Sequence, residues 1–292
     1  MSHVGFHGWN LVPGVDGDIR KYRGRKCSES ASPVVFINGI RTSAQEHRDS
    51  AVVLSTVLRR PVIGVFNASV NTWRDLLQCL RDKATFGIDL FESATGLISP
   101  QANVLLSDLS LLAEKIGGAE LLKSLRQSLD RLSWETLEKA FELVYLVQSK
   151  RASGRLTRAG VAEKAVGQNP ATLGLYRYLR SGGGPSRAVA ILPYSQGNLI
   201  ASNALTAVAL ADGLQAIRGV MVISFGSPCR FWPPGIRHHN FAFANDPVTW
   251  LDGGLVDIGD RRKTGAGLVA HRLEGYLQSF RDQVNKLLTL AG

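Results

Sequence analysis

The stretch at residues 187–202, RAVAILPYSQGNLIAS, constrains the fold more than any other part of the chain. Residues 188–192 are a short apolar run, which is typical of a parallel strand that is covered on both faces. Residues 198–210 carry small and apolar side chains at helical spacing. Gly197 has no Cβ, so the strand and the helix can pass closely. This order predicts a buried strand, a sharp turn that exposes Ser195, and a helix whose N-terminus lies beside the serine oxygen.

Other apolar runs alternate with amphipathic segments along the chain. The predicted strands lie at residues 34–38, 61–66, 219–225 and 241–244, and predicted helices lie at residues 43–59 and 273–290. Such an alternation is typical of an α/β fold, in which a mainly parallel sheet is flanked by helices.

Two segments differ from this pattern. Residues 97–184 contain leucine stripes at helical spacing without a convincing strand, which predicts a helical cap insertion in a domain that spans residues 33–292. Residues 1–32 are rich in glycine, arginine and serine, and they predict an extended or loosely packed N-terminal arm.

The chain is strongly basic. Its 34 Lys and Arg residues against 24 Asp and Glu give a formal charge of +10 and a pI near 9.8. This excess favours anionic partners, either phospholipid headgroups or nucleic acid. No recognition motif supports nucleic acid, so we expect no nucleic-acid partner. The basic stretch at residues 150–164 is interpreted either as a solvated loop or as a contact with an anionic membrane. The residues predicted to face the lipid are Lys150, Arg151, Arg155 and Arg158.

The cysteines and the N-terminus bear on the compartment. Cys27, Cys79 and Cys229 are odd in number and widely spaced, so they indicate neither a disulfide framework nor a zinc site. The N-terminus lacks the layout of a signal peptide, and no apolar run reaches membrane-spanning length. We therefore expect that the protein is cytoplasmic as synthesised. Any export would use a route without a cleaved signal peptide.

Ser195 is a candidate nucleophile. The segment at residues 193–197, PYSQG, has a proline where the usual Gly-x-Ser-x-Gly pattern has its first glycine, so a helix N-cap is the alternative role for this serine. A serine nucleophile requires a histidine base, and the base requires a carboxylate that fixes its tautomer. Asp246 follows an apolar strand, and His271 is the one histidine after it, which gives the chain order serine, acid, base.

Alternatives to these two partners stay open. Asp252, Asp257 and Asp260 also precede His271, and a helix cap or a surface residue is the alternative role for His271. His238 and His239 precede Asp246, and we interpret them as a polar pair entering a strand.

An oxyanion hole needs two backbone N–H donors. The loop after residues 34–38 offers Gly39 or Ile40, and Gln196 follows the serine directly. The alternative is a glycine that is required only by a tight turn.

Several short motifs resemble the lipase branch of the α/β-hydrolases, especially the class 3 triacylglycerol lipases. These are FGSP at residues 225–228, FAFANDPV at residues 241–248, His271 followed by Tyr276, the Asn38-Gly39-Ile40 loop, and YSQG at residues 194–197. The resemblance covers roughly residues 33–90 and 185–290. It implies an α/β-hydrolase fold with Ser195 as nucleophile, Asp246 as orienting acid and His271 as base. A basic chain without a signal peptide is also similar to bacterial phospholipase effectors delivered by secretion machines.

The function that we expect is therefore hydrolysis of carboxylic esters of lipids through an acyl-enzyme, without a metal or organic cofactor. The alternative is a catalytically silent binding or scaffold protein that has kept the fold. The sequence does not indicate the acyl chain, the headgroup or the oligomeric state.

Overall fold

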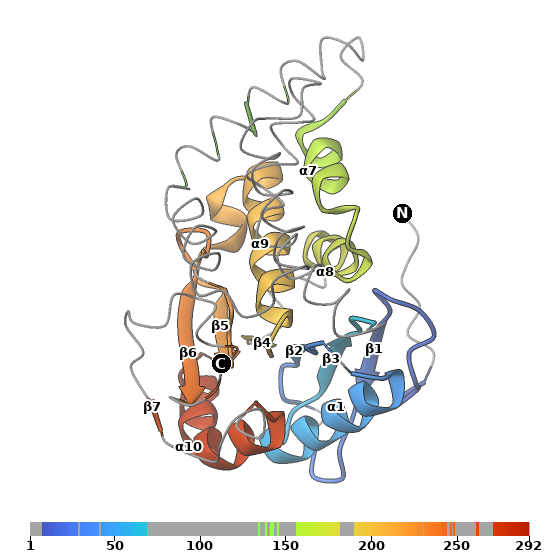
Figure 1. Cartoon of the computed structure of the whole chain (residues 1–292), viewed down its shortest axis with the longest axis vertical. Helices are drawn as coiled ribbons and strands as arrows, with labels where there is room; N and C mark the ends of the chain where they lie inside the picture. Colours follow the sequence, from blue (N-terminus) through green and yellow to red (C-terminus); the bar gives the residue numbers. More distant parts are fainter. Residues whose placement is uncertain are drawn as a thin grey trace, which may run out of the picture.

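A computed structural model describes the chain outside a long central segment (Figure 1). The described residues are 8–28, 30–40, 42–68, 156–181, 190–229, 231–243 and 271–291, the single positions 134, 138, 141, 142, 145, 246 and 248, and the backbone of 261–262.

Within the described residues, one mostly parallel sheet forms the centre of the fold. Its strands are β1 Ile19–Tyr22, β2 Val34–Ile37, β3 Val62–Val65, β4 Ala190–Pro193, β5 Met221–Phe225, β6 Arg237–Phe243 and the short β7 Arg261–Arg262. They lie in the order β1-β3-β2-β4-β5-β6-β7, and every pair is parallel except β1 with β3. The predicted α/β arrangement with a mainly parallel sheet is confirmed.

Helices cover both faces of this sheet (Figure 1). One face carries α1 Ala44–Leu58 and α10 Leu273–Ala291, and the other carries α7 Arg158–Val166, α8 Pro170–Arg180 and α9 Gly197–Asp212. Side chains of a strand alternate between the faces, so Val34 and Phe36 pack with α1 and α10 while Val35 and Ile37 pack with the other layer. None of the described helices combines the length and the apolar character needed to cross a membrane.

Strand β6 begins earlier than predicted. The apolar pattern placed it at residues 241–244, but the structure starts it at Arg237, so His238 and His239 lie within the strand. Parallel pairing joins Met221 to Arg237 and runs up to Phe225 with Phe241. The backbone ladder with β5 does not require apolar side chains, so hydrophobic periodicity did not reveal the first half of β6.

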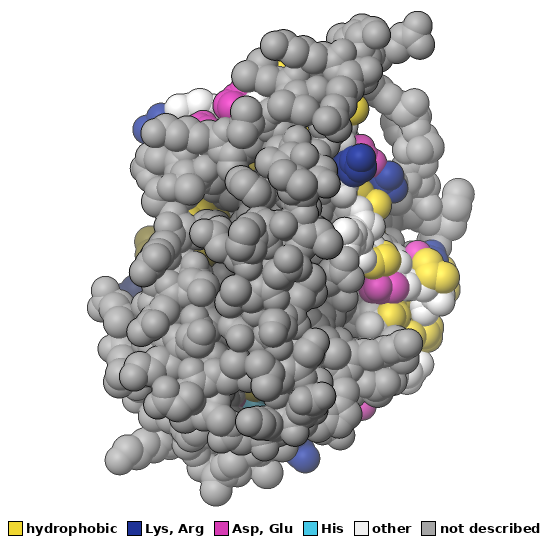
Figure 2. All heavy atoms as spheres, turned by 45° about the horizontal axis from the view of Figure 1, so that its top comes forward, with side chains coloured by type: hydrophobic (Ala, Val, Ile, Leu, Met, Phe, Trp, Pro, Cys, Tyr) yellow, Lys and Arg dark blue, Asp and Glu magenta, His cyan; other side chains and the backbone are white. Residues whose placement is uncertain are grey.

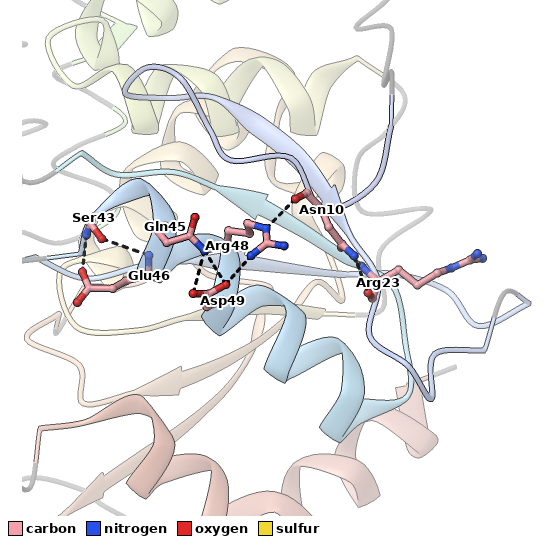
Figure 3. A network of polar contacts seen from close by, with 7 residues as sticks. All are labelled: Asn10, Arg23, Ser43, Gln45, Glu46, Arg48 and Asp49. Atoms are coloured by element: carbon pink, nitrogen blue, oxygen red, sulfur yellow. Dashed lines mark hydrogen bonds and ion pairs between the residues drawn. The ribbon is translucent and has the colours of Figure 1, made fainter.

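The part of the N-terminal arm that contains β1 is extended, which is one of the two predicted alternatives, and it packs against the sheet. This strand pairs antiparallel with β3, and Tyr22 is fully buried beneath α1. The Asn10 side chain donates to the Arg23 carbonyl (3.0 Å) and accepts from the Arg23 N–H (2.7 Å), and Arg48 of α1 donates to the Asn10 carbonyl (2.8 Å; Figure 3). An edge strand needs only one neighbour, so its sequence carries little hydrophobic signal.

The same N-terminal segment presents apolar side chains to solvent before β1 begins. Trp9, Leu11 and Val12 are between two fifths and one half exposed, and Val15 is 65% exposed. Figure 2 shows hydrophobic side chains gathered at the edge of the molecule where this segment lies in Figure 1.

The described end of the predicted insertion belongs to the layer that covers the sheet. Ala162 of α7 and Leu175 of α8 are fully buried in the same cluster as Ile200 of α9 and Ile191 of β4. Most of the leucine stripes assigned to the insertion lie outside the described residues, as do Lys150, Arg151 and Arg155.

Arg158, one of the four residues predicted to face the lipid, has partners within the fold. Its guanidinium donates twice to the Leu210 carbonyl at the end of α9 (3.1 and 2.9 Å) and forms an ion pair with Glu142. It also lies over the Phe141 ring, 5.2 Å from the ring centroid. These contacts hold α7 against α9.

Replacing Tyr22 by alanine should lower the free energy of unfolding by about 3–5 kcal/mol, because the change empties a fully buried aromatic site. Val15→Ala, in the same segment at a position that is 65% exposed, should change it by less than about 0.5 kcal/mol. Urea unfolding of both variants measures the difference. Equal effects would show that the N-terminal segment is not part of the folded unit.

Candidate active site

Ser195 occupies the sharp turn that the sequence predicted between a strand and a helix. It follows β4, precedes α9, and has a φ of 55°, in the left-handed region that side chains other than glycine rarely adopt. Such a conformation costs about 1–3 kcal/mol and persists only where the surroundings enforce it. The expectation of an exposed serine is wrong, because Ser195 is only 3% exposed.

Neighbouring strands hold this turn in place. Pro193 is the last residue of β4 and pairs in register with Ile37, so its missing N–H falls where the chain leaves the sheet. The next two N–H groups are both used, since Tyr194 donates to the Ile37 carbonyl and Ser195 donates to the Phe225 carbonyl, each at 3.0 Å. The proline is therefore compatible with the turn.

Asp246 and His271 form a buried hydrogen-bonded pair. The Nδ1 atom of His271 lies 2.6 Å from Oδ2 of Asp246, whose side chain is fully buried. The same oxygen accepts from the Tyr276 hydroxyl (2.6 Å), and Oδ1 accepts from the Val248 N–H (2.9 Å). Burial and the charge of Asp246 raise the pKa of Tyr276 well above its ordinary value, so its hydroxyl stays a donor.

This pairing determines the state of the other imidazole nitrogen. A carboxylate accepts only, so Nδ1 of His271 carries the proton and Nε2 of the neutral ring is an acceptor. Nε2 is buried and has no hydrogen-bond partner among the described residues. An unpaired buried acceptor is costly in a folded protein, and Nε2 of His271 can accept a proton from a donor brought within hydrogen-bond reach.

Tyr194 and Gly226 connect this pair to the serine turn. The Tyr194 ring stacks on His271 with a centroid distance of 5.0 Å, and its hydroxyl donates to the His271 carbonyl. Gly226 has a φ of 53°, and a Cβ there would lie 2.9 Å from Cε1 of His271. Since Phe225 binds the Ser195 N–H and Gly226 touches the imidazole, the three predicted residues gather at the carboxyl end of the sheet.

The candidate oxyanion loop lies directly against Ser195. A Cβ on Gly39 would be 2.4 Å from the Ser195 Cβ, so only glycine fits there. The Gly39 carbonyl accepts from the Asn38 side-chain amide (2.9 Å). In a trans peptide the following N–H points the opposite way, so this bond turns the Ile40 N–H away from the buried Asn38. Of the two predicted donors on this loop, the geometry favours Ile40, and Gln196 lies at the N-cap of α9.

A buried polar network beneath this loop was not found from the sequence. The Asn38 side chain accepts from the His47 ring (2.8 Å) and the Asn67 N–H (2.9 Å), and donates to the Asn67 carbonyl (2.7 Å). The Asn67 side chain in turn donates to Oε1 of Gln196 (2.9 Å). The network thus links the loop that carries Ile40 to the residue after the serine. One signal could have revealed it, because Asn38 and Asn67 follow the ends of adjacent parallel strands.

His47 of α1 supports this network as a neutral ring. It is fully buried among the rings of Tyr22, Phe36 and Phe66. Burial lowers its pKa from the ordinary 6.5 to about 3. The imidazole is therefore uncharged at neutral pH and donates from Nδ1 to Asn38.

The remaining candidate residues do not join the site. His238 lies early in β6, where Nε2 is 2.8 Å from the Ser224 hydroxyl, and burial followed by the charge of His239 lowers its pKa to about 4. Asp252, Asp257 and Asp260 lie outside the described residues. Among the residues with described side chains, no three His, Cys, Asp or Glu gather as metal ligands would.

Comparison of the chain with protein-family models, curated proteins and solved structures found no match. The chemistry of the site must therefore follow from its own geometry.

The fold should lose stability through His47 as the pH falls from about 6.5 to about 3, because the unfolded chain binds a proton that the buried ring excludes. His47→Leu removes this contribution. In this pH window, the slope of the free energy of unfolding against pH should therefore be smaller in the variant than in the wild type, by about 1.4 kcal/mol per pH unit. Denaturant unfolding over a pH series measures both slopes. Identical slopes would mean that His47 titrates alike in the folded and unfolded chain.

Proposed function

We propose that this chain is a serine hydrolase of the α/β-hydrolase type that cleaves carboxylic esters of lipids. The observation that carries the proposal is the Asp246–His271 pair, which leaves a buried Nε2 acceptor without a partner next to the strained Ser195 turn. Nucleophile, base and orienting acid in this chain order are what acyl transfer requires.

In the proposed reaction, the Ser195 hydroxyl attacks the ester carbonyl while Nε2 of His271 accepts its proton. Asp246 holds Nδ1 and stabilises the imidazolium, as Tyr276 and the Val248 N–H hold the carboxylate. His271 then protonates the departing alcohol, and an acyl-Ser195 ester remains. Water, deprotonated by His271, hydrolyses this ester and restores the serine.

The oxyanion of each tetrahedral intermediate would be stabilised by the N–H groups of Ile40 and Gln196. The Gly39 contact with Ser195 brings the first donor close, and the N-terminus of α9 adds its positive dipole end at the second. Because the Asn38 network fixes both backbone segments, little reorganisation should be needed as negative charge develops.

The lipid part of the proposal rests on the resemblance of residues 225–228 and 241–248 to lipases. The mostly parallel sheet, with a strained serine turn at its carboxyl edge, supports the hydrolase fold. The competing proposal is a binding protein of the same fold without turnover. Its support is the proline at position 193 in place of the usual glycine, although the structure accommodates this proline in the turn.

A fluorophosphonate probe should label the wild-type chain at one site, and Ser195→Ala should abolish the labelling. The probe forms a covalent bond with an activated serine only, so it reports nucleophilicity independently of the substrate. His271→Ala should reduce the labelling rate by at least about a hundredfold, since the general base is removed.

Absence of labelling in a folded wild-type chain would favour the binding protein over the enzyme. Labelling that persists in Ser195→Ala would assign the nucleophile to another residue. The lipid class is tested separately by profiling membrane lipids exposed to wild type and to Ser195→Ala. Release of free fatty acid by the wild type alone is expected, while activity on short esters only would restrict the proposal to a general esterase.

The buried network should act on turnover more than on substrate binding. His47→Leu retains the apolar packing but removes the donor to Asn38, and it should lower kcat by about tenfold to a hundredfold with little change in KM. His47→Asn places an amide donor near the position of Nδ1 and should recover part of the loss. Rates are measured per probe-labelled serine, so that unfolded protein does not count.

Ser55→Ala is the matched control for this comparison. The Ser55 hydroxyl is buried at the other end of α1, where it accepts from the Gly24 N–H (2.8 Å) and donates to the Arg60 carbonyl (2.7 Å). This variant should lose stability and keep its kcat. If kcat falls in both variants in proportion to their stability, the network is structural only.

A further inference from the structure

A polar cavity lies on the face of the sheet covered by α1 and α10. Its volume is about 260 Å³, it opens to solvent, and the C-terminal end of α1 and the C-terminal half of α10 line it. Figure 1 shows these helices side by side along one side of the sheet. Donor side chains dominate its wall: Arg59, Arg60, Arg281, Asn285 and Thr289. None of the described residues that line it is a carboxylate.

Among the described residues, one of the three guanidinium groups has partners within the fold. Arg60 donates to the Leu288 carbonyl and to the Ser32 carbonyl, both at 3.4 Å, and so satisfies part of a helix end. Within the described part of the chain, the side chains of Arg59 and Arg281 form neither an ion pair nor a hydrogen bond. Three like charges that share a cavity repel one another, and two of them have no structural partner there.

Arg59 also occupies a position that normally favours another residue. It is the C-cap of α1 with a φ of 54°, where glycine or asparagine is usual because a Cβ is strained in the left-handed region. Strain of this kind is often kept where a side chain has a function. Here it directs a cationic side chain to the cavity.

We propose that this cavity binds a phosphate group of a phosphomonoester. Planar guanidinium groups match the geometry of phosphate oxygens, and two unpaired arginines provide several charge-assisted donors. The Asn285 side chain supplies a further donor, while the apolar wall formed by Val57, Leu58 and Leu288 suits the organic part of the molecule. A phosphate alone is smaller than the cavity, which favours an ester over the free ion.

This site is separate from the candidate active site. Arg59 and Arg60 precede β3, so the cavity lies toward the amino ends of the parallel strands, whereas Ser195 follows the carboxyl end of β4. The inference therefore does not depend on the proposed hydrolase activity. The same phosphomonoester chemistry occurs in soluble metabolites and in the headgroup of phosphatidic acid, and the experiment distinguishes the two sources.

The test is calorimetric titration with phenyl phosphate and with inorganic phosphate. Wild type should bind phenyl phosphate at one site per chain and more tightly than inorganic phosphate. The double variant Arg59→Asn/Arg281→Gln, which places a residue suited to the left-handed region at position 59, should weaken binding by at least about tenfold. Lys164→Gln/Arg218→Gln removes the same charge from exposed positions on the other face and should leave binding unchanged.

The source of the phosphate is tested with phosphatidylcholine vesicles that contain or lack phosphatidic acid. If the wild type sediments with vesicles that contain phosphatidic acid, and only the Arg59→Asn/Arg281→Gln variant (the pocket variant) fails to do so, the ligand is the lipid headgroup. If the wild type binds phenyl phosphate but does not sediment with these vesicles, the ligand is a soluble ester. Equal weakening in the pocket and control variants would reduce the effect to net charge and overturn the proposal. Absence of saturable phenyl phosphate binding to folded wild type would also overturn it.

Discussion

The hydrogen bond from the Ser195 N–H to the Phe225 carbonyl joins the two strands on which the candidate site depends. It holds a serine in the left-handed region at the point where β4 becomes α9, and it places Gly226 beside His271. A turn of this kind would relax if it were isolated, because its strain is offset only by the packed strands around it. The central parallel sheet is thus the support of the chemistry as well as of the core.

Two buried polar systems meet at this turn from opposite sides. Tyr276 and the Val248 N–H orient Asp246, which orients His271. Asn38 and its partners orient the loop that lies against Ser195. Most polar groups of the two systems are paired with one another, which lowers the cost of burying them. Among the described residues, Nε2 of His47 and Nε2 of His271 are both buried without a hydrogen-bond partner, and the proposed reaction uses the second of them.

The two ends of the sheet offer different chemistry. Residues that follow the strands lie at the carboxyl ends of the strands, and this is where open α/β sheets usually bind ligands. Residues that precede the strands, such as Arg59 and Arg60, lie at the amino ends of the strands, beside the C-terminal half of α10. Helix α1 runs from the carboxyl ends of the strands back to their amino ends. It therefore connects the buried His47, near the candidate site, with the arginines of the polar cavity.

The sequence by itself determined the parallel α/β core and the turn at Ser195, because hydrophobic period and turn chemistry are carried by neighbouring residues. It also supplied the order of Asp246 and His271. Only the tertiary structure decided that these two side chains meet, that β1 joins the sheet, and that Tyr194 stacks on a ring 77 positions further along the chain. The network beneath Gly39 likewise joins residues from separate strands and helices. Such contacts leave no local pattern in the sequence. Many strands end in polar residues, and only the packing of the folded chain decides which of these residues are in contact.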